Sequence, residues 1–421
     1  METRLLPRRI KTTEGKRLVK MKCRFAVVSV LLAAVGTVAP SLAADFTPDA
    51  MDGAAIQRAI DAAHAAGGGR VALRAGVYKS GTICLKSKVE LHVPEGAVVL
   101  GSDKPEDYDD VEDPKSGLRP EKSSKAFIAC VGGEDIALTG GGVIDGQGVK
   151  FYDTSKIIWE YFYAKPPHPR PRMVQFFDCR NVRMEGVTLK DSPGWTCWMR
   201  HCENVSIKNM KIHGEQRMIN NDGIDIDSCR KVRIAGCDLK TGDDCIVMRA
   251  MRSSRDNGVI PVCEDLLVEN CTLDSFCQCI RLSCPSDGVI RRGVFRNLKM
   301  RGRNGVLSGH PVRYCMKGDK GYCVMEDLSV EDCDIDAWGH AISFNVEEGV
   351  QLKEFGNVAF RRVRIKSRAP LQLQGTKASA LKNIRMEDVS GTVEAVKALD
   401  VAGVQGLDMK GFSVTSGVGA K

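Results

Sequence analysis

Residues 220–249 read NNDGIDIDSCRKVRIAGCDLKTGDDCIVMR, and they carry the clearest structural pattern in the chain. Apolar and polar residues alternate in two short runs, one through Ile224 and Ile226 and one through Val232 and Ile234. Alternation with a period of two is typical of β-strands that bury one face. The stretch therefore predicts short strands joined by turns.

Three acidic residues accompany these strands. Asp222 precedes Asp243 and Asp244 by 21 and 22 residues, about the length of one coil of a strand-turn-strand solenoid. If the chain closes one coil over this distance, the acidic residues lie on neighbouring rungs, roughly 4.8 Å apart along the stack. We therefore expect three carboxylates to meet on one outer face. Such a cluster, beside glycines that let the chain bend, is a candidate hydrolytic site.

A six-residue pattern of the same kind recurs along the chain. It occupies residues 135–140, 181–186, 204–209, 231–236, 265–270, 327–332, 357–362 and 383–388. Most copies end at Asn, Asp or Gly, which tolerate the bent backbone of a tight turn. No copy can bury its own apolar face, but stacked copies form one continuous core, as in a parallel β-helix. A β-propeller is the rival fold, but it requires hairpin signals such as Asn-Gly, which are sparse here.

The residues before the repeat suggest a cap and two long loops. Ile56, Ile60 and Ala63 have helical spacing, and the glycines after Ala66 end the pattern, so we expect a short helix over residues 54–66 that caps the solenoid. Residues 101–125 are polar and charged, and residues 149–172 are rich in aromatic residues and proline. We interpret both segments as exposed loops, and a long loop beside a cleft often shapes substrate entry.

The first 44 residues differ in composition from the rest. They contain nine basic and two acidic residues, so they supply +7 of the formal charge of +8 and leave about +1 for the remainder. An apolar run over residues 25–39 and the small residues Ser41-Leu42-Ala43 follow. This order predicts an export signal over residues 1–44, with Met21 an alternative start and cleavage near Ala43 or Ala44. A membrane anchor is the other interpretation, but the run is short for a bilayer.

Residues 45–421 then form one domain. Its charge gives no reason to expect nucleic acid as a partner, and no other apolar run is long enough to span a membrane. We expect a secreted or periplasmic monomer that has no membrane contact after signal removal.

The 17 cysteines follow the repeat more closely than a disulfide framework. Cys179, Cys202, Cys229 and Cys263 occupy one position of the repeat, which suggests small hydrophobic residues stacked in the core. No Cys-x-x-Cys pair supports a zinc site, so we expect neither metal nor cofactor. The cysteines outside the repeat columns remain candidates for disulfides: Cys277, Cys279, Cys284, Cys315 and Cys323.

Clustered carboxylates on a solenoid suit hydrolysis of a linear glycan. In inverting glycosidases one carboxylic acid protonates the leaving oxygen while another carboxylate activates water, roughly 6.5–9.5 Å away. The close pair Asp243–Asp244 favours one protonated acid near neutral pH, because like charges raise the pKa of one partner.

Over about residues 50–390 the chain resembles glycoside hydrolase family 28, the polygalacturonase-like enzymes that degrade pectin. Asn220-Asn221-Asp222-Gly223 resembles the family's Asn-Thr-Asp-Gly, and Gly242-Asp243-Asp244-Cys245 resembles its Asp-Asp-Cys motif. Supporting matches are residues 140–148, Arg170-Pro171 and residues 191–195. The resemblance implies a right-handed parallel β-helix. It also implies that Asp244 is the general acid and that Asp222 and Asp243 hold the water.

The chain departs from the family where a Gly-His-Gly and an Arg-Ile-Lys motif are expected. Gln278 stands in place of the histidine, and neither cation of the second motif is present in residues 304–309. Arg249 and Arg281 lie on nearby rungs and could replace those cations, so the candidate substrate-binding residues are Asn220, Arg249, Gln278 and Arg281. His340 mimics the missing motif, but it lies about three rungs away.

Three functions compete at this point. The first is an exported glycosidase acting on a pectin-like or related polysaccharide or oligosaccharide. The second is a β-helical polysaccharide lyase, which would need calcium on the carboxylates and an Arg or Lys base. The third is a catalytically silent glycan-binding β-helix.

Asp225 and Asp227 alternate with buried isoleucines, so we expect them on a solvated face, and Trp195 is expected to pack in the interior.

Overall fold

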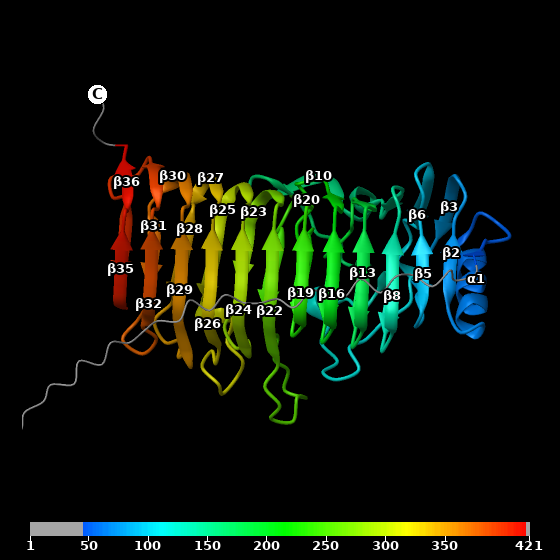
Figure 1. Ribbon diagram of the computed structural model, residues 1–421, viewed down its shortest axis with the longest axis horizontal. Coiled ribbons are helices and arrows are strands. Elements are labelled where there is room, and N and C mark those ends of the chain that lie inside the picture. Colours follow the sequence, from blue (N-terminus) through cyan, green and yellow to red (C-terminus); the bar gives the residue numbers. More distant parts are fainter. Residues whose placement is uncertain (1–44, 418–421) are drawn as a thin grey trace, which may run out of the picture. The chain divides into compact units, whose positions relative to one another are not determined.

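The computed structural model describes residues 45–417, so the predicted export signal lies outside the described residues. The described chain is mostly β, and its strands are wound into a solenoid of stacked coils (Figure 1). The coils have three faces, and the strands of these faces pair in parallel with strands of the neighbouring coils. This confirms the predicted parallel β-helix.

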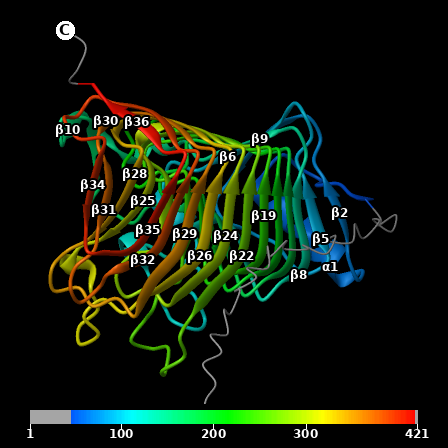
Figure 2. The same ribbon diagram turned by 60° about the vertical axis from the view of Figure 1, so that its left-hand side comes forward.

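The first face is a 13-stranded parallel sheet (Figure 2). Its strands are β1 (Asp45–Phe46), β2 (Gly69–Ala72), β5 (Val89–His92), β8 (Glu134–Thr139), β13 (Arg180–Glu185), β16 (Glu203–Lys208), β19 (Arg230–Ala235), β22 (Val262–Glu269), β24 (Val289–Arg296), β26 (Val324–Glu331), β29 (Glu354–Arg361), β32 (Leu381–Glu387) and β35 (Val404–Lys410).

The second and third faces together form a 21-stranded sheet, because β23 and β25 continue from one face into the other. The second face holds β3 (Gly76–Ser80), β6 (Ala97–Gly101), β9 (Val143–Asp145), β14 (Thr188–Lys190), β17 (Lys211–His213), β20 (Asp238–Thr241), the first halves of β23 (Thr272–Leu282) and β25 (Lys299–His310), β27 (Asp334–His340), β30 (Arg364–Ala369), β33 (Ser390–Val393) and β36 (Ser413–Ser416). The third face holds β4 (Ile83–Cys84), β7 (Ala126–Val131), β12 (Arg172–Phe177), β15 (Cys197–Arg200), β18 (Ile224–Asp227), β21 (Ile246–Arg249), the second halves of β23 and β25, β28 (Ile342–Val346), β31 (Leu371–Gln374) and β34 (Leu399–Ala402).

Polar ladders and left-handed residues explain the repeated six-residue pattern. The first residue of each copy, such as Asn181 or Asn204, has a positive φ, and so does the last residue of each copy. Asn181 donates to Asp135 over 2.8 Å, and Asn204 donates to Asn181 over 2.7 Å. Asn and Asp tolerate the left-handed conformation better than other side chains. The prediction that the copies end in tight turns is confirmed.

One helix, α1 (Gly53–Ala65), lies at the end of the stack, where it packs against β1 to β5 (Figure 1). Asp52 caps its first turn by accepting a hydrogen bond from the backbone N–H of Ala55 over 2.8 Å. Ile56 and Ile60, on the inner face of this helix, are fully buried. The helix was predicted over residues 54–66, and the capping role follows from the apolar face that it lays over the first coils.

The two predicted loops are insertions that connect the second face to the third. The second insertion contains more secondary structure than the sequence predicted. Residues 102–125 contain two short 3-10 helices, Pro105–Asp107 and Pro120–Lys122. The second insertion contains a 3-10 helix, Gly148–Phe151, and an antiparallel hairpin of β10 (Asp153–Ile158) and β11 (Phe162–Ala164). Another 3-10 helix, Val312–Tyr314, follows β25.

The core runs the length of the solenoid and includes the predicted cysteine column, since Cys179, Cys202, Cys229 and Cys263 are buried among aliphatic side chains. All sixteen cysteines of residues 45–417 are free thiols. The cysteines left as candidates for disulfides are therefore unpaired. Within the same residues, no helix is long and apolar enough to cross a bilayer.

A substitution in this core should destabilise the fold. Phe344 is fully buried, and its ring lies 5.2 Å from that of Phe355 and 5.8 Å from that of Phe360. We expect Phe344→Ala to lower the free energy of unfolding in urea by about 3–5 kcal/mol, because it removes apolar contacts and leaves a cavity. Met409→Ala on exposed β35 should change it by less than about 0.5 kcal/mol. Equal effects of the two substitutions would contradict this account.

Candidate active site

The three acidic residues meet at the turn between the second and third faces. Asp222 lies between β17 and β18, and Asp243 and Asp244 lie between β20 and β21. The register pairs Ile224 with Ile246, so Asp222 stands beside Asp244 on neighbouring rungs. One oxygen from each of the three carboxylates lies within 4.8 Å of the others.

Two glycines allow the chain to approach itself closely here. A Cβ on Gly223 would lie 2.4 Å from the carbonyl oxygen of Cys245, on the next rung. A Cβ on Gly242 would lie 2.2 Å from the carbonyl oxygen of Met218. Any side chain at either position would push these segments apart. The glycines of the two motifs therefore keep the acidic residues together.

The site holds its carboxylates largely away from water. Asp222 and Asp244 are 5% and 2% exposed, whereas Asp243 is half-buried. Burial, together with the neighbouring Asp243 charge, raises the pKa of Asp244 to about 7. The same causes raise the pKa of Asp222 well above its usual range. Asp222 and Asp244 each have one oxygen, Oδ1, without a hydrogen-bond partner within residues 45–417.

Two guanidinium groups stand beside the carboxylates on the third face. Nη1 of Arg281 lies 3.3 Å from Oδ2 of Asp244, and Nη2 lies 2.6 Å from Sγ of Cys284. Nη2 of Arg249 lies 3.4 Å from Oδ1 of Asp287. In both arginines Nε is buried and has no hydrogen-bond partner in the described chain. The two cations therefore retain hydrogen-bonding capacity next to the acidic cluster.

Asn220 and Gln278 also lie next to the acidic residues. The backbone N–H of Asn220 donates to Oδ2 of Asp243 over 3.2 Å, and its side chain accepts from Arg170 over 3.0 Å. Gln278 lies one rung beyond Asp244, since its carbonyl oxygen accepts from the N–H of Cys245. The structure thus brings all seven candidate residues to one turn and the adjoining strands.

Some residues that support the site were not identified as supports from the sequence. Arg170 is buried and donates to the carbonyl oxygens of Pro193 and Ile219 and to the hydroxyl of Tyr152. It thereby holds the segment that ends in Asn220. Asp287, the partner of Arg249, lies in a turn with no motif of its own. The match of Arg170-Pro171 to the family could have identified Arg170 from the sequence, whereas no sequence motif marks Asp287.

The expectation that Asp225 and Asp227 lie on a solvated face is wrong. They are 1% and 0% exposed, because the insertion 102–125 and the segment after β21 cover this part of the third face. Asp227 accepts a hydrogen bond from Arg200 over 2.5 Å, and Arg200 also donates to Asp113 in that insertion over 2.6 Å. Alternation located these side chains on the outer face correctly, but it could not show that a distant loop covers them.

Trp195, His310 and His340 are not part of the candidate site. Trp195 is buried against Trp198, as expected. The register places His340 three rungs beyond Asp244, through Gln278 and Asn304, so it lies too far away to contact the acid. His310 is 1% exposed, and burial together with the nearby Arg281 charge lowers its pKa to about 3. It is therefore neutral at physiological pH.

Two clusters in residues 45–417 have carboxylate or imidazole atoms close enough to hold a cation. One is the acidic trio itself. The other consists of Asp113, Asp178 and His201, where Lys115 and Arg200 already pair with the two carboxylates. The buried Arg200 and the exposed Lys115 thus balance the charge of the two carboxylates, although Nδ1 of His201 is buried without a hydrogen-bond partner in the described chain. The pair between Arg200 and Asp113 helps to fix the insertion 102–125.

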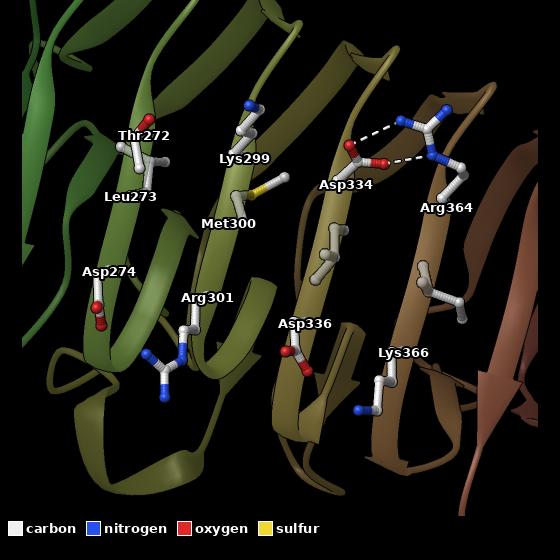
Figure 3. A pocket seen from close by; sticks show the side chains of 12 residues that line it. Thr272, Leu273, Asp274, Lys299, Met300, Arg301, Asp334, Asp336, Arg364 and Lys366 are labelled. Atoms are coloured by element: carbon white, nitrogen blue, oxygen red, sulfur yellow. Dashed lines mark hydrogen bonds and ion pairs between the residues drawn. The ribbon is translucent and has the colours of Figure 1, made fainter.

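A depression of about 460 Å³ lies on the second face, over β23, β25, β27 and β30 (Figure 3). Charged side chains of both signs stand along it, including Asp274, Arg301, Asp336 and Lys366. Arg364 forms two hydrogen bonds with Asp334 across neighbouring strands. This surface is a cross-strand charge ladder, which stabilises sheets without implying a ligand.

Sequence comparisons agree with the geometry. Residues 114–260 match the sequence model of glycosyl hydrolases family 28. A probable polygalacturonase of Vitis vinifera is 27% identical over 190 residues, which are 44% of this chain and 37% of the relative. An endo-polygalacturonase of Pectobacterium parmentieri is 24% identical over 341 residues, which are 76% of this chain and 78% of the relative. The chain covers only 24–37% of the length of the first three curated relatives that it matches.

Solved structures share the fold. An exopolygalacturonase from Thermotoga maritima has a TM-score of 0.68 at 21% identity, covering 88% of this chain and 92% of the other. The polygalacturonase from Erwinia carotovora has a TM-score of 0.62 at 18% identity, covering 87% and 97%. The solenoid is thus a right-handed parallel β-helix. The family match over residues 114–260 includes the acidic site, so this part of the chain is similar to glycosyl hydrolases family 28.

Proposed function

We propose that this protein is a glycoside hydrolase of the polygalacturonase type, with Asp222, Asp243 and Asp244 as its catalytic residues. The observation that carries the proposal is the meeting of three carboxylates from two neighbouring rungs, with one oxygen of each within 4.8 Å. Two of them lie in the segment that matches the family motif Asp-Asp-Cys and one in Asn-x-Asp-Gly. Hydrolysis of a glycosidic bond requires an acid and a base on opposite sides of that bond, and clustered carboxylates can supply both.

Asp244 is the proposed general acid. Its carboxyl is almost fully buried, and its pKa of about 7 keeps a large share of it protonated near neutral pH. Burial alone would raise the pKa further, but the guanidinium of Arg281 at 3.3 Å opposes this. The acid can therefore hold a proton and still release it to a leaving oxygen.

Asp222 and Asp243 are proposed to hold the attacking water. Asp243 is the most exposed of the three, and its Oδ2 is oriented by the N–H of Asn220. Oδ1 of Asp222 has no hydrogen-bond partner in the described chain, and one oxygen of Asp222 lies within 4.8 Å of an oxygen of Asp243. With two carboxylates on the water and a third on the leaving oxygen, we propose an inverting reaction. The nearest oxygens of the carboxylates lie closer than the roughly 6.5–9.5 Å expected between the paired carboxyl groups of an inverting enzyme. The anomeric configuration of the product, measured by NMR, is therefore the test. A product that retains the configuration of the substrate would refute inversion.

The proposed substrate is a pectin-like polysaccharide or oligosaccharide that contains uronate. Arg249 and Arg281 stand on successive rungs, and a guanidinium is well suited to bind a carboxylate through two hydrogen bonds. Gln278 and Asn220 complete the proposed contacts with hydrogen-bonding groups. Relatives named polygalacturonase support this substrate class.

A polysaccharide lyase is the second candidate, because the three carboxylate oxygens are close enough to hold a divalent cation and Arg281 stands beside them. A panel of polysaccharides separates the functions. Hydrolysis yields new reducing ends without ultraviolet-absorbing products, whereas a lyase yields unsaturated ends. Binding without any product would favour a silent glycan-binding protein.

We also propose that residues 1–44 direct export and are then removed, which leaves a secreted or periplasmic, monomeric protein. The basic segment and the following apolar run support this proposal. N-terminal sequencing of the protein recovered outside the cytoplasm should find a new terminus near Ala43 or Ala44. Recovery of the intact chain from the membrane fraction would instead indicate an anchor.

Replacing the acid tests its role directly. We expect Asp244→Asn to reduce kcat on polygalacturonate by roughly 10²–10⁴-fold, because the amide cannot donate a catalytic proton. The far-ultraviolet circular dichroism spectrum should remain that of the parent protein. Asp408→Asn, on exposed β35, is the matched control and should retain full activity. Near-normal turnover by Asp244→Asn would show that the acid is another residue.

The pKa of Asp244 predicts the alkaline limb of activity. Because the acid must be protonated, kcat/KM should fall tenfold per pH unit above about pH 7. Arg281→Met removes the cation that lowers the pKa of Asp244, so the limb should move to higher pH even if KM rises. Arg180→Met, on the exposed first face, should leave the limb in place. A limb that moves to lower pH in Arg281→Met would contradict the proposed charge balance.

A further inference from the structure

The hairpin β10–β11 presents the most exposed aromatic ring beside the site. A hydrogen bond from the N–H of Tyr161 to the carbonyl oxygen of Ile158 closes its turn, and Trp159 and Glu160 occupy the two central positions with φ of 50° and 63°. Such turns favour Asn-Gly, because large side chains are disfavoured at positive φ. Trp159 is nevertheless 71% exposed. A bulky residue in a disfavoured conformation, without burial in return, suggests a functional reason for its position.

This hairpin is attached to the segment that carries Asp222. The N–H of Tyr163 donates to the carbonyl oxygen of Arg217 over 2.9 Å, and Nε of Arg217 donates to the carbonyl oxygen of Tyr161 over 3.3 Å. The guanidinium of Arg217 also lies 4.5 Å from the centre of the Tyr163 ring. Arg217 precedes Asp222 by five residues on the same turn segment. The position of the hairpin is therefore coupled to the acidic trio.

Further aromatic rings continue from the hairpin along the solenoid. Tyr161 stacks on Phe276 with an interplanar angle of 1°, and the Phe276 ring centre lies 5.7 Å from that of Trp338. Phe276 lies two residues before Gln278, on the rung after Asp244. Trp338 lies two residues before His340, two rungs further on. These four residues, Trp159, Tyr161, Phe276 and Trp338, are called the aromatic row below.

Packing explains part of the row, since Tyr161 and Phe276 stack on each other and pack against the core, but it does not explain the exposed Trp159. Phe162 fills the packing role in the hairpin, since it is 6% exposed and makes edge contacts with Trp159, Tyr161 and Phe276. The members of the row remain partly or largely exposed. Phe276 lies one rung beyond Asp244 and Trp338 two rungs further, so a glycan that runs from the trio along the stacking direction passes near these two rings.

We propose that the aromatic row binds consecutive sugar rings of the polysaccharide chain on the C-terminal side of the acidic trio. The inference rests on the proposed glycosidase function and extends it by assigning subsites for a long chain. Aromatic rings combine a large apolar surface with little conformational freedom, and the C–H faces of a pyranose ring stack well on them. The row would bind the rings, while Arg249 and Arg281 bind carboxylates beside the trio.

Tryptophan fluorescence tests the proposal without requiring turnover. The chain has four tryptophans, and Trp195 and Trp198 are buried, so a change in emission on adding a glycan would report on Trp159 and Trp338. The probe is an octamer of galacturonate, added to Asp244→Asn protein so that it is not cleaved. We expect a saturable change in emission, weakened roughly tenfold in Kd by Trp159→Ala or Trp338→Ala. Met409→Ala, on the first face, is the control and should bind as the parent does.

Kinetics separates failure of this inference from failure of the proposed function. In otherwise active protein, Trp338→Ala should lower kcat/KM for the octamer about tenfold and leave the shortest cleaved oligomer unchanged. If Trp338→Ala and the parent protein have the same kcat/KM for the octamer and also for the shortest cleaved oligomer, the row is not a binding site, although the glycosidase function stands. If no protein hydrolyses glycan but the octamer binds through the tryptophans, the row stands and the catalytic proposal fails.

Two further outcomes would overturn the inference. The first is octamer binding that both tryptophan substitutions leave unchanged. The second is a dimer, detected by sedimentation of the free protein, that Trp159→Ala abolishes, because the exposed ring would then serve as a contact between two copies of this chain.

Discussion

The hydrogen-bonded register between successive coils is the constraint on which the structure depends. Each strand of a coil pairs in parallel with the strands of the coils before and after it, so the rung spacing of roughly 4.8 Å is imposed by backbone geometry and not by side chains. Residues about one coil apart are thereby brought side by side. This is how Asp222 comes to stand next to Asp244, and how Phe276 and Trp338 come to follow the same edge.

The same register makes the site electrostatically costly. Three carboxylates at one turn would repel one another strongly, and burial of two of them removes the water that screens charge. The structure offsets this with guanidinium groups on the adjoining strands, of which Arg281 contacts Asp244 directly. The balance leaves a proton on part of the cluster near neutral pH. A buried, partly protonated cluster is what acid–base chemistry on a glycosidic oxygen requires.

The insertions decide which part of the third face remains available. Residues 102–125 cover Asp227 and Arg200 with a buried ion pair to Asp113, so this stretch is closed to ligands. The hairpin β10–β11 instead carries an exposed ring and is hydrogen-bonded to Arg217, on the segment that leads to Asp222. Both insertions join the second face to the third, and both contact residues far away in the sequence. Their opposite effects follow from the side chains that they carry.

Much of the architecture follows from the sequence by itself. Alternating apolar residues, a repeated turn position occupied by Asn or Asp, and the spacing between Asp222 and Asp244 are local patterns, and a stacked solenoid converts local spacing directly into contacts. The tertiary structure decided what local patterns cannot encode. Asp225 and Asp227 are buried because a loop more than 100 residues earlier covers them, and Asp287 pairs with Arg249 from a turn without a motif. Burial and long-range pairing depend on where distant insertions pack, and no period in the sequence records that.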